Sequence, residues 1–417
     1  MKNRVLIYAH YYAPDVASTG QIVQDIAEGM LNDFEVSVIC VVPSYTGTIE
    51  EKYKKKRFYF ENINGVNIIR VRVPEFSKDN KLSRIRNILT YFFLGMLASF
   101  KVGRQDVVFS ISQPPILGGL LGLFGKLLKN AKYIYNIQDF NPEQIMAVGY
   151  NKNSILLNFL MAVDKFTCRH ADMVVTVGRD LVETLKRRFN NEDLPKLSMI
   201  NNWIDEKNIY PLSSKNEGVL AFKKKYSLDD KFVIMYSGNI GLYYDLDNII
   251  KVIKDFPPGM TSYDGRILMF AFVGAGTLLK QLKEYVKENH MTNVCFIPYQ
   301  DKSKLIYSLN AGDVHWCVNA RGIKGVSCPS KAYGIMAVGK PMIGVLEKGT
   351  EIRGLIDEIG CGKCCEPGEY QEVKNILNWY VKNNGQTLGR EGRRYLESEL
   401  TKEKGVNRYI SAIRSIL

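Results

Sequence analysis

The sequence predicts an α/β protein built from two doubly wound parallel sheets, and three observations lead to this prediction. Buried apolar runs of strand length alternate with stretches of helical periodicity in each half of the chain. A turn-rich connector over residues 201–216, which contains Pro211 and a Ser213-Ser214 pair, separates the two halves. The length of 417 residues also suits two domains.

The first half opens as a strand, a loop, a helix and a second strand, which together make a parallel βαβ unit. The helical spacing of Ile22, Ile26 and Met30 predicts the helix. The strands expected in this half cover residues 5–9, 36–42, 66–73, 106–112, 133–137 and 171–177. The pattern therefore predicts a Rossmann-like sheet whose ligands bind at the carboxyl ends of its strands.

The second half shows the same alternation without a detectable sequence repeat. Its expected strands cover residues 232–236, 267–273, 294–297, 313–318 and 341–345. Its expected helices cover residues 246–254, 278–288, 302–309 and 330–338. We therefore expect domains over 1–205 and 206–389 with a ligand cleft between them. A charged helical tail over 390–417 should pack back toward the first domain.

The composition restricts the partners and the compartment. The net charge of +13 suits an anionic ligand or membrane, but no nucleic-acid-binding motif accompanies it, so no nucleic-acid partner is expected. The N-terminal apolar run breaks at His10, which is too short for a signal peptide and predicts a cytoplasmic protein. The group Cys361, Cys364 and Cys365 has half the ligands of a zinc site and no second half, so free thiols are expected.

Three glycine loops follow predicted strands. The first contains Gly20 and Gln21, the second Gly238 and Asn239, and the third Gly274. Glycine lets the backbone approach an anion, and a helix N-terminus offers unpaired N–H groups. Each loop alone is typical of an ordinary strand-to-helix turn. Three of them at strand ends favour a phosphate-bearing ligand.

The segment over residues 321–334 runs from a strand into a helix and is rich in cations. Arg321 and Lys324 precede Ser330, which with Pro329 supplies a helix start. Lys331 then lies in the first turn, where a cation is unfavourable unless an anion sits above it. This placement predicts a diphosphate site. The alternative is a solvent-facing lysine that tolerates roughly a few tenths of a kcal/mol of dipole repulsion.

These segments resemble a known family. Residues 329–341, PSKAYGIMAVGKP, are similar to the donor-site helix of family-4, GT-B fold, retaining glycosyltransferases, and most similar to the bacterial branch of L-fucosamine and colanic-acid-type transferases. Five further segments agree in order and spacing: YYAPDVASTGQ at 11–21, QDFNPE at 138–143, NWID at 202–205, YSGNIG at 236–241 and FVGAG at 272–276. The resemblance implies two Rossmann-like domains, the first for the acceptor and the second for a nucleotide sugar.

The chain departs from the family pattern at several positions. Most members carry two glutamates where this sequence has Val326 and Gly334, and an Arg and a Lys where it has Asn239 and Tyr244. The contacts that those groups make to ribose, sugar and phosphate must therefore come from other residues. The cations available are Lys331, Arg321 and Lys324.

The resemblance implies a hexosyltransferase that uses a UDP-sugar, with UDP-N-acetyl-L-fucosamine or a related UDP-hexosamine as candidate donors. The implied acceptor is a glycan on a polyprenyl diphosphate, in O-antigen or capsule biosynthesis, with the anomeric configuration retained. Negative charge builds on the departing diphosphate, which Lys331, the N–H groups near Ser330 and the Gly20 loop would stabilise. The acceptor would attack from the face that the leaving group departs from, and the donor phosphate would take the proton.

Further candidates follow strand ends. Asp139 would orient the donor sugar or the acceptor hydroxyl, although a turn-forming role fits it equally, and Glu143 is a second catalytic candidate. Tyr299 would lie beside the base, or in the core. Asp245-Leu-Asp247 opens a helix, where carboxylates serve the helix dipole, so no obligatory metal or other cofactor is expected.

Two other functions fit parts of the sequence. A non-hydrolysing UDP-sugar epimerase shares the two-domain fold but needs acid and base groups in its cleft, and of the four histidines only His10 lies in a suitable loop. A non-enzymatic sugar- or nucleic-acid-binding protein would explain the charge but not the loops that converge with Lys331.

A helix expected over residues 84–101 has basic ends and an apolar middle of about 14 residues, short of the ~20 that span a bilayer. It suits either a core helix, closely packed through Gly95 and Ala98, or a helix that lies in the membrane interface. A second basic cluster covers residues 52–57. We expect a cytoplasmic protein peripherally bound to the anionic inner face of the plasma membrane.

Overall fold

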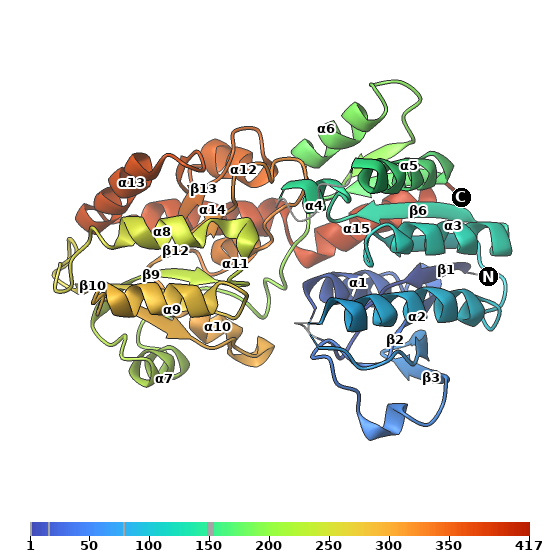
Figure 1. Ribbon diagram of the computed structural model, residues 1–417, viewed down its shortest axis with the longest axis horizontal. Coiled ribbons are helices and arrows are strands. Elements are labelled where there is room, and N and C mark those ends of the chain that lie inside the picture. The colour runs from blue at the N-terminus through green and yellow to red at the C-terminus, as the bar shows by residue number, and fades with distance from the viewer. Residues whose placement is uncertain (1, 16, 78–79, 148–153) are drawn as a thin grey trace. The chain divides into compact units, whose positions relative to one another are not determined.

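The computed structural model describes residues 2–15, 17–77, 80–147 and 154–417, which form two compact units, each organised around one sheet (Figure 1). Unit 1 comprises Met1–Asn201, Gly325–Ser327 and Lys402–Leu417. Unit 2 comprises Asn202–Lys324 and Cys328–Thr401. The chain therefore passes from unit 2 into unit 1 and back within a few residues, and it ends in unit 1.

The sheet of unit 1 has eight strands in the order β3-β4-β2-β1-β5-β6-β7-β8. The strands are β1 Asn3–Tyr8, β2 Phe34–Val41, β3 Phe58–Ile63, β4 Val66–Val71, β5 Val107–Ile111, β6 Lys132–Ile137, β7 Met173–Thr176 and β8 Leu197–Met199. All neighbours are parallel except β3 and β4, which form an antiparallel hairpin. Every residue of the central strand β5 is buried, as expected of a parallel strand covered on both faces.

Helices cover both faces of this sheet. They are α1 Ser18–Gly29, α2 Lys81–Ser99, α3 Leu117–Lys129, α4 Glu143–Ala147, α5 Ser154–His170, α6 Arg179–Arg188 and α15 Lys402–Arg414, with a 3-10 turn at Glu51–Tyr53. Helix α2 packs beside α3, and α3 packs beside α5 (Figure 1). Helix α1 packs against α15, where Val406 lies so close to Gly29 that a Cβ there would meet its Cγ1 at 2.7 Å.

Unit 2 holds a six-stranded, all-parallel sheet in the order β11-β10-β9-β12-β13-β14. The strands are β9 Lys231–Ser237, β10 Ile267–Val273, β11 Val294–Ile297, β12 Val314–Val318, β13 Met342–Val345 and β14 Gly362–Cys365. Side chains alternate between the two faces, so Ile234 and Tyr236 of β9 join one hydrophobic cluster, while Val233 and Met235 join another.

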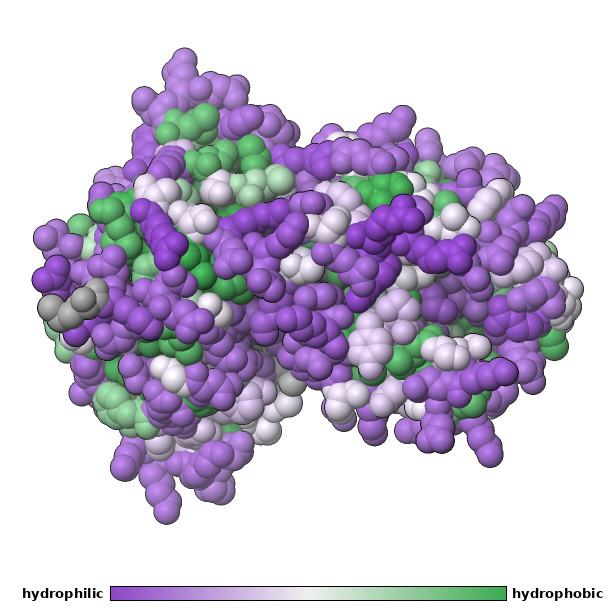
Figure 2. Space-filling model, turned by 180° about the vertical axis from the view of Figure 1, so that it is seen from behind, coloured by the Kyte–Doolittle hydropathy of each residue, from purple (hydrophilic) through white to green (hydrophobic). Residues whose placement is uncertain are grey.

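The helices of unit 2 pack over these two clusters and over a third, to which α11, α12 and α14 contribute. They are α7 Glu217–Lys225, α8 Leu246–Ile253, α9 Leu279–Glu288, α10 Lys302–Ala311, α11 Lys331–Ala337, α12 Glu351–Ile359, α13 Tyr370–Lys382 and α14 Gln386–Glu399, with a 3-10 turn at Leu242–Tyr244. Helix α8 packs against α9 and α13, whereas α11 and α12 pack against α14. Figure 2 shows the opposite face of the molecule, where hydrophilic residues dominate and apolar residues form scattered patches.

The predicted strands agree with the observed ones to within two residues at each end. The sequence analysis missed the strands β3, β8 and β14 and the helices α3, α4, α7, α12 and α13. Cys364 and Cys365 lie in strand β14, and Cys361 directly precedes it. Among the described residues, no cluster of three or more His, Cys, Asp or Glu side chains could hold a metal ion. The tail expected over residues 390–417 is not a single segment, because α14 belongs to unit 2 and α15 belongs to unit 1.

Candidate functional site

Two glycine loops of unit 2 pack directly on each other at the carboxyl ends of β9 and β10. Gly238 and Gly274 have φ values of +150° and +144°, which L side chains rarely adopt. A Cβ on Gly274 would lie 1.9 Å from the Gly238 carbonyl oxygen. The Gly238 N–H donates to the Val273 carbonyl at 2.9 Å and joins the loops. Glycine is therefore required at both positions for the two loops to approach so closely.

Lys331, the first residue of α11, lies against these loops. A Cβ on Gly238 would be 2.3 Å from the Lys331 Cε, so the missing side chain provides the space through which the lysine passes. The ammonium then lies 3.4 Å from the ring centroid of Tyr244 and 5.1 Å from that of Tyr236. Two aromatic faces therefore hold this cation by cation–π attraction.

The Lys331 ammonium has no anionic partner among the described residues. In the part of the chain that the structure describes, no carboxylate forms an ion pair with it. Burial lowers the pKa of Lys331 to about 7, only slightly offset by the Cys317 thiol. A phosphate brought next to this group would restore its charge, which is the behaviour expected of an anion-binding lysine.

The other cations predicted at this site serve the loop itself. The Arg321 guanidinium donates to the Pro367 carbonyl at 2.8 Å, and the Lys324 ammonium donates to the Lys348 carbonyl at 2.5 Å. Glu347 accepts the backbone N–H groups of Gly322 and Lys324 at 2.9 and 3.1 Å. These bonds hold the loop over residues 321–324 in place and leave Lys331 as the one predicted cation here without such a bond among the described residues.

Ser330 does not have the capping role that the sequence suggested. Its backbone is already helical, with φ −62° and ψ −14°, and its side chain makes no capping hydrogen bond. Asn239 is exposed, and its carbonyl accepts from the Tyr236 hydroxyl at 2.5 Å. Tyr299 follows β11 and is 58% exposed, which excludes the core position considered for it. All three lie at the carboxyl edge of the sheet of unit 2.

In unit 1 the predicted loop residues open α1 after β1. Gly20 sits so near the Tyr11 carbonyl oxygen that a Cβ would meet it at 3.0 Å, and Gln21 donates its backbone N–H to Ala17 at 3.0 Å. Thr19 hydrogen-bonds Gln113 of the loop after β5. The first turn of α1 contains no acidic residue, so its positive end remains available to an anion.

Asp139 lies just past the end of β6, where residues 325–327 return to unit 1. Asp139 and Ser327 form an antiparallel bridge, and the Phe140 N–H donates to the Val326 carbonyl at 2.8 Å. Burial raises the pKa of Asp139, and the Ser327 hydroxyl counteracts this in part. Val326, which replaces a family glutamate, thus takes part in the backbone pairing that holds residues 325–327 beside Asp139.

Glu143 is engaged in a buried ion pair. The Arg188 Nε donates to one carboxylate oxygen of Glu143 at 2.7 Å, and its Nη2 donates to the other at 2.5 Å. The same guanidinium also pairs with Asp164, donates to the Asn141 carbonyl at 2.8 Å and lies 4.3 Å from the Phe140 ring centroid. This pairing favours a structural role for Glu143, while Asp139 and Glu143 both stay candidate catalytic carboxylates of unit 1.

His10, on which an epimerase reading would depend, is buried between aromatic rings. Its ring stacks on Tyr11 at 4.3 Å and lies 4.9 Å from Tyr91 of α2. Burial lowers its pKa to about 4, only partly offset by Asn87. A histidine held neutral in the interior is poorly placed for acid–base work on a substrate, so the geometry disfavours an epimerase.

Each of the two units matches a known protein family. Residues 19–203 match the glycosyl transferase 4-like domain, and residues 220–400 match the glycosyl transferases group 1 domain. Each unit thus carries a glycosyltransferase domain. The group 1 match is confined to residues 220–400, and together the two glycosyltransferase domains cover most of the chain.

Two curated proteins are similar over most of the chain. The glycosyltransferase named WbjE of Pseudomonas aeruginosa is 26% identical over 348 residues, which cover 83% of this chain and 84% of that protein. The colanic acid biosynthesis glycosyl transferase named WcaI of Escherichia coli is 24% identical over 426 residues, which cover 99% of this chain and 100% of that protein.

Solved structures confirm the predicted GT-B fold. Sucrose-phosphate synthase of Thermosynechococcus elongatus superposes with a TM-score of 0.76 at 14% identity, covering 100% of this chain and 99% of that one. HepE of Anabaena, in complex with UDP and glucose, gives 0.68 at 13% identity, covering 99% of both chains. WaaG, a glycosyltransferase of lipopolysaccharide biosynthesis, gives 0.64 at 12% identity, covering 97% and 99%.

Proposed function

We propose that this glycosyltransferase moves a sugar from a UDP-sugar to a lipid-linked glycan in bacterial surface polysaccharide synthesis, with retention of configuration. The observation that carries the donor half is Lys331, a cation held between aromatic rings against two glycine loops, with no carboxylate partner in the described part of the chain. HepE, which shares the fold, was solved with UDP and with UDP-glucose. UDP-N-acetyl-L-fucosamine and related UDP-hexosamines are the donors to test first.

The chemistry requires stabilisation of the departing diphosphate. As the glycosidic bond to the donor phosphate breaks, negative charge builds on the phosphate oxygens, and a preorganised cation stabilises it at no reorganisation cost. Lys331 supplies that cation. Asp139 of unit 1 would orient a sugar hydroxyl. The acceptor hydroxyl loses its proton to the donor phosphate as the new bond forms.

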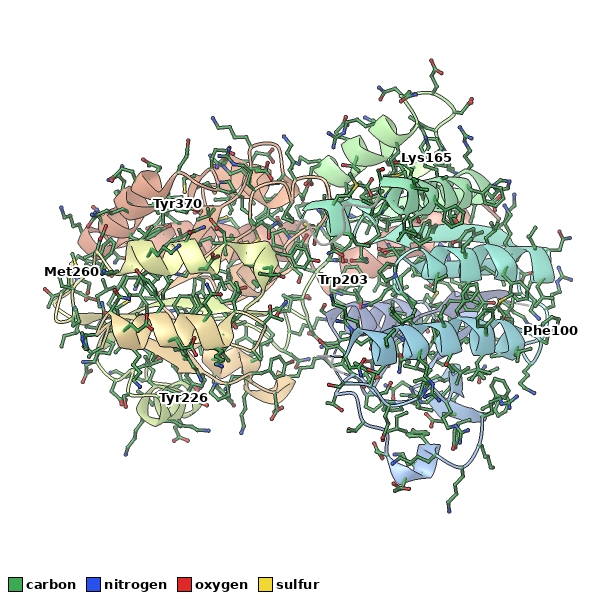
Figure 3. The ribbon with its side chains drawn as sticks, in the orientation of Figure 1. Phe100, Lys165, Trp203, Tyr226, Met260 and Tyr370 are labelled. Carbon is green, nitrogen blue, oxygen red and sulfur yellow. The ribbon has the colours of Figure 1, made fainter. Side chains whose placement is uncertain are left out.

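We propose that transfer needs no divalent metal. The carboxylates nearest to a metal-binding pattern, Asp245 and Asp247, flank the start of α8. Asp245 accepts from the Tyr370 hydroxyl at 2.9 Å and from the Asn248 amide at 2.7 Å, so its oxygens are already used (Tyr370 is labelled in Figure 3). Activity should therefore survive EDTA. Complete loss that Mg²⁺ or Mn²⁺ restores would contradict this.

We further propose that unit 1 binds the cytoplasmic face of the plasma membrane. No helix in the described part of the chain is long and apolar enough to cross a bilayer. One side of α2 packs on the sheet through Tyr91, Gly95 and Ala98. Its other side exposes a row of apolar side chains: Leu82, Ile85, Leu89, Phe93 and Leu97, followed by Phe100. Phe100 lies at the carboxyl end of α2 and is 64% exposed (Figure 3). Such a row suits an interfacial helix.

Thermal shift with UDP, GDP and ADP tests the donor site directly. A ligand present at a hundredfold excess over its Kd contributes about 2.7 kcal/mol to the free energy of unfolding, so UDP should raise Tm more than GDP or ADP does. Product analysis by mass then follows transfer from each UDP-sugar to a lipid-linked acceptor. Absence of a shift with every nucleoside diphosphate would refute the donor site.

A further inference from the structure

A groove of about 870 Å³ lies in unit 1 between α2 and the β3–β4 hairpin. Arg57 and Arg72, which flank the hairpin, lie on one side, and α2 contributes Arg86 together with apolar residues on the other. The residues that line it are Arg57, Arg72, Val73, Pro74, Leu82, Ile85, Arg86, Leu89, Thr90, Phe93 and Leu94. The lining contains three positive charges and no carboxylate, and its volume lies within the range of ligand sites.

Two of the arginines, Arg57 and Arg72, oppose each other at the open end of the hairpin. Arg57 precedes β3 and Arg72 follows β4, so the register that pairs Phe58 with Val71 makes these two arginines the next opposing pair. The Arg72 N–H donates to the Arg57 carbonyl at 3.0 Å, which continues the ladder to this pair. Like charges directly opposite each other in an antiparallel pair are destabilising.

Two of the neighbouring lysines have carboxylate partners. Lys52 pairs with Glu50 at 2.9 Å, and Lys54 pairs with Glu51 at 2.8 Å. The guanidinium groups of Arg57 and Arg86, by contrast, form no ion pair with any described residue. The carboxylates of this region thus pair with Lys52 and Lys54, and among the described residues none forms an ion pair with the arginines of the groove.

The position of the groove orients its occupant. Arg72 follows the carboxyl end of β4, the same edge of the sheet at which α1 and the Gly20 loop follow β1. Helix α2 runs away from this edge, and its exposed row continues from Leu82 through Phe93 to Phe100. An anionic head would therefore sit at the edge where acceptors are expected, and an apolar chain would lie along the helix.

We propose that this groove binds the diphosphate head and the first isoprenoid units of the lipid-linked acceptor. The proposal rests on the lipid-linked acceptor of the proposed function and assigns its recognition to named residues. Guanidinium forks match phosphate oxygens in two-point hydrogen bonds. Ile85, Leu89 and Phe93 would cover the chain next to the diphosphate, so the glycan at the other side of the head is presented at the carboxyl edge of the sheet.

Binding of farnesyl diphosphate to the full-length protein, followed by calorimetry, tests this proposal. The double variant R57Q/R86Q should bind it at least about tenfold more weakly, because two charge-assisted contacts are lost. The matched control K55Q/K56Q removes the same charge from exposed lysines of the same loop and should bind within about twofold of the parent. L89S/F93S should weaken farnesyl diphosphate binding and leave the weaker binding of inorganic diphosphate unchanged.

Two further measurements separate the outcomes. R57Q/R86Q should keep the Tm of the parent or exceed it, because it relieves repulsion, and it should keep the UDP-induced shift. Equal farnesyl diphosphate affinity in parent and R57Q/R86Q would overturn the proposal. So would binding only to phosphatidylglycerol vesicles, which would make the groove a site for bulk headgroups. Farnesyl diphosphate binding without any UDP-induced shift would refute the donor function and leave the groove assignment standing.

Discussion

Unit 1 and unit 2 each bury one cation against aromatic rings, and the two cations differ in their partners. Arg188 of unit 1 faces Glu143, Asp164 and the Phe140 ring. Lys331 of unit 2 faces two tyrosine rings, and no described carboxylate pairs with it. Burial acts to lower the pKa of both side chains. The carboxylates nonetheless raise the pKa of Arg188, whereas the pKa of Lys331 falls to about 7. We infer that a cation with carboxylate partners stabilises the fold, whereas one with no carboxylate partner among the described residues is suited to bind an anionic ligand.

Removing a partner of Arg188 should give the largest effect, and it should be on stability. Glu143→Gln should lower the free energy of unfolding by about 3 kcal/mol, the lower end for a broken buried pair, because Asp164 remains. Urea unfolding measures this. Glu183→Gln removes a carboxylate from the exposed pair with Lys186, whose N–O distance is 2.8 Å, and should cost less than about 0.5 kcal/mol. Loss of turnover at unchanged stability would instead make Glu143 catalytic.

Removing Lys331 should act on catalysis. Lys331→Ala deletes a charge-assisted contact to the diphosphate, so kcat/KM for the UDP-sugar should fall roughly tenfold to a hundredfold. Lys324→Ala is the matched control, since the Lys324 ammonium donates to the Lys348 carbonyl, and it should keep most of the activity. Steady-state kinetics on variants with native circular dichroism decide between the two. Unchanged turnover in Lys331→Ala would contradict the proposal that Lys331 binds the diphosphate.

The smallest effect is the pH dependence of donor binding. Because Lys331 titrates near pH 7 in the unliganded protein, the Kd for the UDP-sugar should rise above that pH, by at most about tenfold per unit. Rising pH should have the opposite effect on the stability of the fold. The reason is that the unfolded chain keeps this proton up to the ordinary pKa of lysine. This lysine therefore destabilises the fold below about pH 7, and its contribution improves as pH rises. Isothermal titration calorimetry of UDP-sugar binding from pH 6 to 9 measures this dependence. In Lys331→Met the Kd should no longer rise above pH 7.

Local pattern was enough to predict much of the fold and part of the site. The strands of unit 2 follow from uninterrupted apolar runs, and Lys331 follows from a cation in a helical first turn. The β3–β4 hairpin was missed although its signal was present, because Asn64-Gly65 forms the turn with φ values of 52° and 91°. Strand β14 was hidden by Gly362 and Lys363, residues that seldom mark a buried strand.

Other features of the site have no local signal. The tyrosines around Lys331 lie about 90 residues earlier in the chain, and nothing in either segment indicates that they meet. The bridge between Asp139 and Ser327 joins the two halves of the sequence within unit 1. The partner of Glu143 lies 45 residues away on α6. Long-range packing decides these contacts, so the role of each carboxylate could be assigned only once the fold was known.

The late return of the chain into unit 1 affects how the protein is made. Helix α15 completes unit 1 when the Asn136 amide of β6 donates to the Tyr409 hydroxyl at 2.5 Å and Phe109 of β5 packs against the Tyr409 ring at 5.8 Å. During translation the strands of unit 1 are synthesised before unit 2, whereas Tyr409 is synthesised after it. Unit 1 is therefore completed only after unit 2 has been made, and until then nascent chains lack the contacts of Tyr409 with β5 and β6.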